Sequence, residues 1–148
     1  MCVGVIKQFS VSRQDTAPAL AILDSASGKT LRRWSMDEGS EFAIEFIHSV
    51  NNSPVRETFR IENGMIRPVA VRFYSFGAGM PAEPEEGQQL SRDGDALVIS
   101  GFKRSFSELN YIVGTVSDHL LLVNGLSISL RDLCGKNAHI TIVYLSNK

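Results

Sequence analysis

Residues 41–62 read EFAIEFIHSVNNSPVRETFRIE, and this stretch decides the fold. Apolar side chains recur at every second position on both sides of a polar centre, as in strands that bury one face. The intervening residues 51–54 are typical of a turn, because asparagine, serine and proline favour turn conformations. We therefore predict two antiparallel strands, over 41–50 and 54–62, that form a hairpin.

The rest of the chain repeats this alternation between Ser-Gly, Asn-Gly and Asp-Gly pairs, which supply the positive φ of tight turns. The predicted strands are 19–24, 30–36, 41–50, 54–62, 65–76, 95–102, 107–116, 119–129 and 138–145. Residues 130–135 form at most a short helical turn. Eight or nine short strands need a second layer or closure to bury their apolar faces. We therefore predict an all-β fold, a meander-like antiparallel β-sandwich or barrel.

The length of 148 residues leaves room for one domain, which we assign to 19–148, with 1–18 as a first strand or a frayed segment. A content of 43% hydrophobic and 21% charged residues excludes a mainly disordered chain. The net charge of −1 lacks the basic excess of nucleic-acid-binding proteins. No apolar run approaches the roughly 18 residues needed to span a membrane. We therefore expect neither a nucleic-acid partner nor a membrane-spanning segment.

Two polar residues share the apolar faces of the predicted hairpin. His48 alternates in step with Phe46, and Glu57 alternates in step with Phe59, so both side chains are expected to point toward the core. If 51–54 is the loop, His48 lies directly opposite Glu57. Such a pair is either a base held by a carboxylate, a polar patch that anchors a ligand, or a purely structural cross-strand pair.

The turn at 63–64 decides whether a third polar residue joins this pair. A two-residue turn places Arg72 diagonally beside Glu57, whereas a bulged three-residue turn turns Val71 inward and sends Arg72 to solvent. The apolar pattern of this strand favours the bulge slightly.

A long loop, 77–92, interrupts the regular spacing of the strands. It is rich in glycine, proline and carboxylates, and loops longer than about 12 residues in a compact domain are usually functional or disordered. Gly77 and Gly79 lie at its start, where successive backbone amides could bind an anion. The same glycines also suit any tight bend.

Metal, cofactor and thiol chemistry find little support. His119 is expected at the edge of the core and His139 on the solvent side, so the three histidines do not converge on a metal. Cys2 and Cys134 have neither metal nor redox spacing, and the sequence leaves open whether they pair. We expect no cofactor.

Three motifs stand at fixed distances along the chain. They are His48-Ser49-Val50, then Pro54-Val55 with Glu57, then Phe76-Gly77-Ala78-Gly79 with Pro81, and they follow Trp34 and Gly39. This combination resembles the bacterial family called domain of unknown function 1850, over about 20–145. The resemblance implies a role for the motif residues, no established enzymatic activity, and an extracytoplasmic accessory role beside TAXI-class TRAP transporters. Residues 1–7 lack the pattern of an export signal, which leaves the compartment open.

Three functions follow from these observations. The leading expectation is an accessory domain of TRAP-type solute uptake that binds a small organic solute or a transporter component. Its expected ligand-binding residues are His48, Ser49, Glu57, Arg72, Gly77 and Gly79. The second is a protein-interaction module that docks through the loop 77–92. The third, less expected, is a hydrolase-like enzyme that uses His48 as a base oriented by Glu57.

Overall fold

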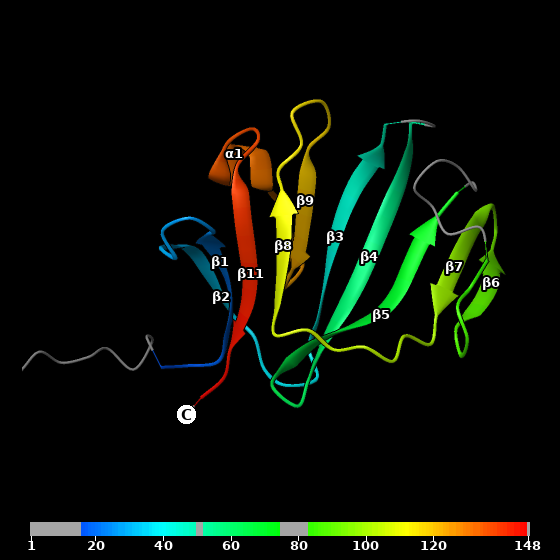
Figure 1. Cartoon of the computed structure of the whole chain (residues 1–148), viewed down its shortest axis with the longest axis horizontal. Coiled ribbons are helices and arrows are strands. Elements are labelled where there is room, and N and C mark those ends of the chain that lie inside the picture. Colours follow the sequence, from blue (N-terminus) through cyan, green and yellow to red (C-terminus); the bar gives the residue numbers. More distant parts are fainter. Residues whose placement is uncertain (1–15, 50–51, 75–82, 148) are drawn as a thin grey trace, which may run out of the picture.

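The computed structural model describes residues 16–49, 52–74 and 83–147, which fold into two antiparallel sheets (Figure 1). One sheet consists of β1 (Ala19–Asp24), β2 (Thr30–Ser35), β8 (Glu108–Ile112) and β11 (His139–Leu145), in the order β2-β1-β11-β8. The other consists of β3 (Glu41–His48), β4 (Ser53–Glu62), β5 (Met65–Phe73), β6 (Gln89–Asp93), β7 (Ala96–Ser100), β9 (His119–Val123) and β10 (Leu126–Ser129), in the order β10-β9-β3-β4-β5-β7-β6. We call them the four-stranded and the seven-stranded sheet.

The all-β fold is confirmed, and the strand count and the barrel alternative are corrected. There are eleven described strands rather than eight or nine, and they form two separate sheets instead of one closed barrel. The predicted strand 119–129 is a hairpin, because Asn124 and Gly125 both adopt positive φ and turn the chain between β9 and β10. The extra strand β6 begins within the predicted loop 77–92 and ends one residue after it.

The strand β6 has no apolar alternation that sequence reasoning could detect. All five of its residues are exposed. Its backbone pairs with β7, and it is the last strand of the seven-stranded sheet. An edge strand with solvent on most sides needs no buried face. Residues 75–82, which include the start of the predicted loop, lie outside the described part of the chain.

A main core joins the two sheets. Leu20 and Ile142 of the four-stranded sheet are fully buried in one cluster with Ile44, Ile61 and Leu121 of the seven-stranded sheet. A smaller cluster lies away from it on the longer sheet. It consists of Val55, Phe73, Leu97 and Ile99, on β4, β5 and β7. Because four strands cannot cover seven, β6 and β7 extend beyond the four-stranded sheet, at the opposite end of the molecule from β1 and β2 (Figure 1).

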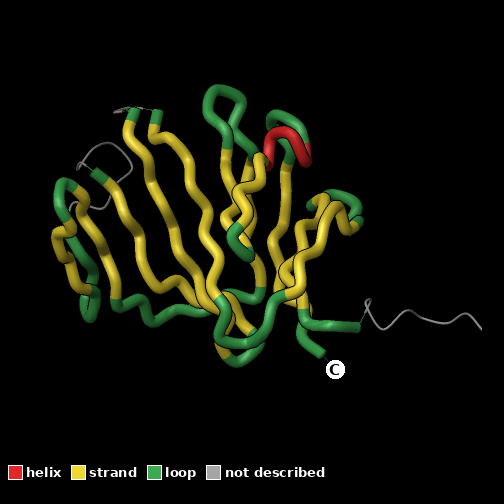
Figure 2. The backbone as a smooth tube through the Cα atoms, turned by 180° about the vertical axis from the view of Figure 1, so that it is seen from behind, coloured by secondary structure: helices red, strands yellow, loops and turns green. Residues whose placement is uncertain are grey.

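Strands and loops make up nearly all of the described chain, and α1 (Leu130–Cys134) is the one helix there (Figure 2). Its position confirms the predicted helical turn at 130–135. The Ser129 hydroxyl caps it by accepting a hydrogen bond from the Asp132 amide at 3.0 Å. Within residues 16–49, 52–74 and 83–147, no helix has the length and apolar character that crossing a membrane requires.

The N-terminal assignment stays a prediction. Residues 1–15, with Cys2, lie outside the described part of the chain, and β1 begins at Ala19. The division into a segment 1–18 and a domain 19–148 is therefore untested. Cys134, at the end of α1, is half-buried, and burial raises the pKa of its thiol. Whether it pairs with Cys2 stays open, because Cys2 is not described.

Candidate functional site

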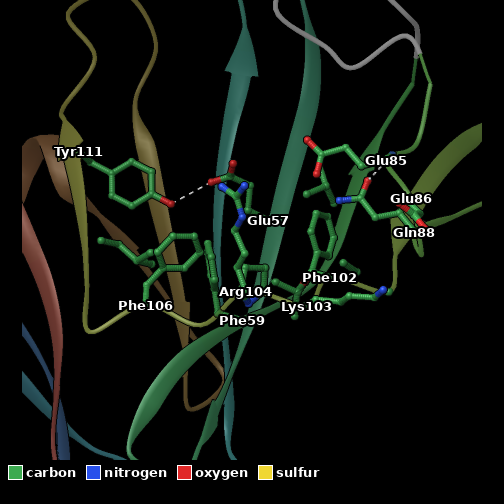
Figure 3. Close-up of a pocket in the computed structure, with 16 residues that line it drawn as sticks. Glu57, Phe59, Glu85, Glu86, Gln88, Phe102, Lys103, Arg104, Phe106 and Tyr111 are labelled. Carbon is green, nitrogen blue, oxygen red and sulfur yellow. Dashed lines mark hydrogen bonds between the residues drawn. The ribbon is translucent and has the colours of Figure 1, made fainter.

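A groove of about 530 Å³ opens where the seven-stranded sheet extends beyond its partner (Figure 3). Strands β4 and β5 form its floor, and residues 101–111, which lead from β7 through β8, form one wall. The apolar lining residues include Phe59, Pro68, Val71, Phe102, Phe106 and Leu109. The polar and charged ones include Glu57, Glu85, Glu86, Gln88, Lys103, Arg104 and Tyr111. The groove is therefore apolar in its body and charged at a few points, as in many small-molecule sites.

Two glycines allow the wall to form. Gly101 has a φ of +81°, and a Cβ there would lie 2.7 Å from the carbonyl oxygen of Gly87. A Cβ on Gly87 would lie 2.7 Å from Cε of Lys103, so the lysine side chain lies across this glycine. The approach of Gly101 to the Gly87 backbone requires a residue without a side chain, and the φ of +83° at Gly87 also favours glycine. The two glycines bring the turn at 85–88 against the residues that follow β7.

Backbone hydrogen bonds fix the other end of the wall. Ile66 and Phe106 exchange two N–H···O=C bonds, each of 2.8 Å, so the connection between β7 and β8 runs along the edge of β5. The Arg67 guanidinium donates to the Phe102 carbonyl at 3.3 Å and forms an ion pair with Glu62 at 2.6 Å. The aromatic rings of the wall are thereby held over the floor.

Glu57 is a carboxylate on a mainly apolar inner face. Its neighbours across the sheet are Ile44 on β3 and Val71 on β5. Tyr111 reaches it from the four-stranded sheet, and the phenol donates a hydrogen bond of 2.8 Å to Oε2 (Figure 3). Among the described residues, no hydrogen bond is made to the second oxygen, Oε1. The groove thus contains a carboxylate oxygen that is available to a ligand.

Burial governs the acid–base behaviour of this pair. It raises the pKa of Glu57, because the charged form loses solvation, and the hydrogen bond from Tyr111 offsets the rise only in part. Burial and the nearby charge of Glu57 also raise the pKa of Tyr111. The tyrosine therefore stays a neutral hydrogen-bond donor, while Glu57 takes up a proton more readily than an exposed glutamate.

An aromatic cluster supports Tyr111. The ring of His119 lies 5.2 Å from that of Phe46 and 6.0 Å from that of Tyr111. The Gly114 amide donates to Nδ1 of His119 at 3.2 Å, and burial lowers the pKa of this imidazole against the opposing effect of Asp118. His119 is therefore the neutral tautomer with its proton on Nε2. It lies half-buried at the edge of the core, and the described residues contain no cluster of three metal-ligating side chains.

The groove lies in the part of the chain that a family comparison matches. The match covers residues 42–130, which run from β3 to the first residue of α1, and its description is Domain of unknown function (DUF1850). The chain belongs to this family. Neither the curated proteins nor the solved structures contain a match. The DUF1850 match includes every described residue that lines the groove.

Within the DUF1850 region, the predicted pairing of His48 with Glu57 is wrong. The observed register places His48 opposite Ser53 and Glu57 opposite Ile44. Both polar side chains share the inner face, as alternation predicts, but they stand four positions apart along the sheet, about 13 Å. At this separation, Glu57 cannot orient His48 as a base through a hydrogen bond.

The register differs because the turn comes earlier than predicted. The Asn52 amide donates to the His48 carbonyl at 2.9 Å, and Asn52 takes the left-handed conformation with a φ of 51°. Pro54, which we placed where the loop 51–54 meets the predicted strand 54–62, is the second residue of β4. Pairing of β4 with β5 begins only at Arg56. The proline, which has no N–H group, therefore costs no hydrogen bond between these two strands.

Arg72 is the second correction in the DUF1850 region. The turn at 63–64 has two residues, but Val69 forms a bulge within β5. As a result, Arg72 lies opposite Arg56, and its side chain does not lie beside Glu57. The Arg72 side chain forms an ion pair with Asp93 and lines a different, shallow pocket. As the bulge alternative predicts, Val71 faces inward, opposite Glu57.

The remaining predicted ligand residues are distributed as follows. Ser49 is exposed just after β3, and His48 is half-buried at its end; neither lines the groove. Gly77 and Gly79 lie outside the described residues. Of the four predicted residues that the structure describes, Glu57 alone lines the groove, and the involvement of the other residues in ligand binding stays a prediction.

Sequence reasoning missed Tyr111 and the basic wall residues Lys103 and Arg104. Tyr111 does alternate in step with Leu109, so an inward position was detectable. Its contact with Glu57 was not, since the two residues come from different sheets and are 54 positions apart. The close approach of the wall depends on Gly101, a glycine at a strand end that by itself indicates only a bend.

Replacing Glu57 with glutamine is expected to make stability less dependent on pH. A raised pKa means that the folded protein binds more protons than the unfolded chain above about pH 4.5. The free energy of unfolding of the wild type therefore falls as the pH rises from there through the raised pKa, and Glu57→Gln removes this loss while keeping an acceptor for Tyr111. Denaturant unfolding at pH 4, 6 and 8 measures the effect.

Glu86→Gln is the control for this prediction, because it removes a carboxylate from the exposed rim of the same groove. The change in pH dependence caused by Glu57→Gln should exceed the change measured for this control. A constant difference between wild type and Glu57→Gln at all three pH values would contradict the prediction.

Proposed function

We propose that this protein is a binding domain whose groove takes a small organic molecule with an apolar body and one polar end group. The polar end would bind at Glu57, and the apolar body would pack against Phe59, Phe102 and Phe106. The observation that carries the proposal is the free oxygen of a half-buried carboxylate inside an apolar groove of about 530 Å³. That volume falls in the usual range for small-molecule sites.

The stability cost of Glu57 supports this proposal. A carboxylate between Ile44 and Val71 loses solvation, and its raised pKa reflects this cost. An apolar residue at position 57 would suit the inner face better. Ionisable groups with perturbed pKa values in clefts are typical of functional sites. At such sites, binding can require a residue that lowers the stability of the fold.

The family resemblance extends the proposal to biology. Proteins that resemble this one are often encoded beside TAXI-class TRAP transporters, so we propose that the bound molecule is a solute and the domain an extracytoplasmic accessory of its uptake. This part rests on the resemblance alone. The groove supports a ligand-binding role independently of any transporter.

Thermal unfolding with a panel of small aromatic and aliphatic amines, alcohols and carboxylic acids tests the binding role. A ligand present at about 100 times its dissociation constant should stabilise the fold by about 2.7 kcal/mol. Val71→Trp, which puts a large ring beside Glu57, should abolish the shift. Ile112→Trp, at an exposed position of β8 that does not line the groove, should retain it. The proposal fails if every ligand shifts wild type and Val71→Trp equally.

A further inference from the structure

We propose that the groove selects ligands whose polar end is an ammonium group, so that its ligand class is small amphipathic amines. This inference rests on the proposed binding function and adds the charge of the ligand. It follows from the charges and rings that surround Glu57.

In the described part of the chain, no lysine, arginine or histidine forms an ion pair with the Glu57 carboxylate. The ion pairs among the described residues join other carboxylates, namely Glu41, Glu45, Glu62 and Asp93, to arginines. The groove contains Lys103 and Arg104, and the Arg104 side chain extends toward Glu57 in Figure 3, but neither residue forms an ion pair with Glu57. Lys103 instead lies across Gly87 on the wall. A ligand ammonium would supply the positive charge that this half-buried carboxylate lacks.

Aromatic rings around Glu57 favour the same charge. Tyr111 is hydrogen-bonded to it, and Phe59 lies two positions along the same strand and face. Phe102 and Phe106 lie along the wall (Figure 3). The faces of aromatic rings attract cations, most strongly where water is excluded. A ligand carboxylate would meet the like charge of Glu57 in the same place, which disfavours both ionised groups.

Three probes that share a phenyl ring and have chains of similar length test the inference. They are 2-phenylethylamine, 2-phenylethanol and 3-phenylpropanoate, which carry charges of +1, 0 and −1 at neutral pH. Dissociation constants are measured at pH 7.5 by titration calorimetry or by chemical-shift changes in NMR spectra. We expect the wild type to bind the amine at least about tenfold more tightly than the alcohol, and the acid most weakly.

Variants assign this preference to one carboxylate. Glu57→Gln should bind amine and alcohol within about twofold of each other, because the amide retains hydrogen bonding but has no charge. Glu108→Gln, which makes the same chemical change at an exposed position of β8 outside the groove, should retain the preference for the amine. Circular dichroism confirms that each variant is folded.

The outcomes separate the inference from the proposed function. Equal binding of amine and alcohol by the wild type overturns the inference and leaves the binding function standing. Tightest binding of the acid also overturns it, and would assign selection to Lys103 and Arg104. If none of the three probes binds, the inference fails, and the ligand panel with Val71→Trp decides the binding function separately. An amine preference that survives in Glu57→Gln overturns the assigned residue and with it the inference.

Discussion

Replacing Gly101 with alanine is expected to lower the free energy of unfolding by about 2–4 kcal/mol and to displace the wall of the groove. The left-handed backbone conformation at this position costs an alanine about 1–2 kcal/mol. Its Cβ would also lie 2.7 Å from the Gly87 carbonyl oxygen, so the turn at 85–88 must move away. Overpacking of this kind typically adds about 1–3 kcal/mol. Denaturant unfolding measures the loss, and ligand titration measures the effect on the groove.

Gly39→Ala is the matched control. Gly39 has a φ of +83°, nearly the same as Gly101, but a Cβ there meets nothing within 4 Å. Its replacement therefore isolates the backbone strain, and we expect a loss of about 1–2 kcal/mol. Equal losses in the two variants would show that the approach to Gly87 does not hold the wall.

Phe59→Ala should destabilise the fold by about 3–5 kcal/mol, the usual cost of truncating a buried phenylalanine. This side chain is only 6% exposed, and its ring stacks on that of Phe42 at a centroid distance of 5.2 Å. Phe59 belongs to the main core and also forms part of the groove floor. Thermal or denaturant unfolding gives the magnitude.

Phe106→Ala makes the same chemical change on the wall of the same groove. This ring is 37% exposed, so less apolar surface returns to water, and we expect a loss below about 2 kcal/mol. A loss as large as that of Phe59→Ala would mean that the wall, and not the shared core, stabilises this part of the molecule.

Turns with local chemistry could be predicted from the sequence. The Asn-Gly pairs at 63–64 and 124–125 both adopt positive φ at both residues, and each closes a two-residue hairpin. The all-β class and the strand β1 at 19–24 followed from alternation. In each case the deciding interactions lie within a few residues of one another.

Features set by more distant or subtler interactions could not be predicted. The hairpin of β3 and β4 contains no glycine, and its register depends on Asn52 in a left-handed conformation, which several turns of this length could supply. The extra residue of β5 is Val69, directly after Pro68. The alternation of apolar residues does not show whether such an extra residue lies in the turn or within the strand. For the site, alternation identified Glu57, while Tyr111 came from the opposing sheet.

The unequal width of the two sheets also divides the stability of the molecule. Strands β6 and β7 depend on the small cluster of Val55, Phe73, Leu97 and Ile99, whereas β1 and β11 are anchored in the main core. The end that carries β6 and β7 can therefore open locally at a lower free energy than global unfolding requires. Because Gly101 directly follows β7, such opening would take apart the wall of the groove. A bound ligand would then shift the equilibrium toward the closed form by mass action. Ligand binding would therefore be detected first as slower hydrogen exchange of the backbone amides in β7.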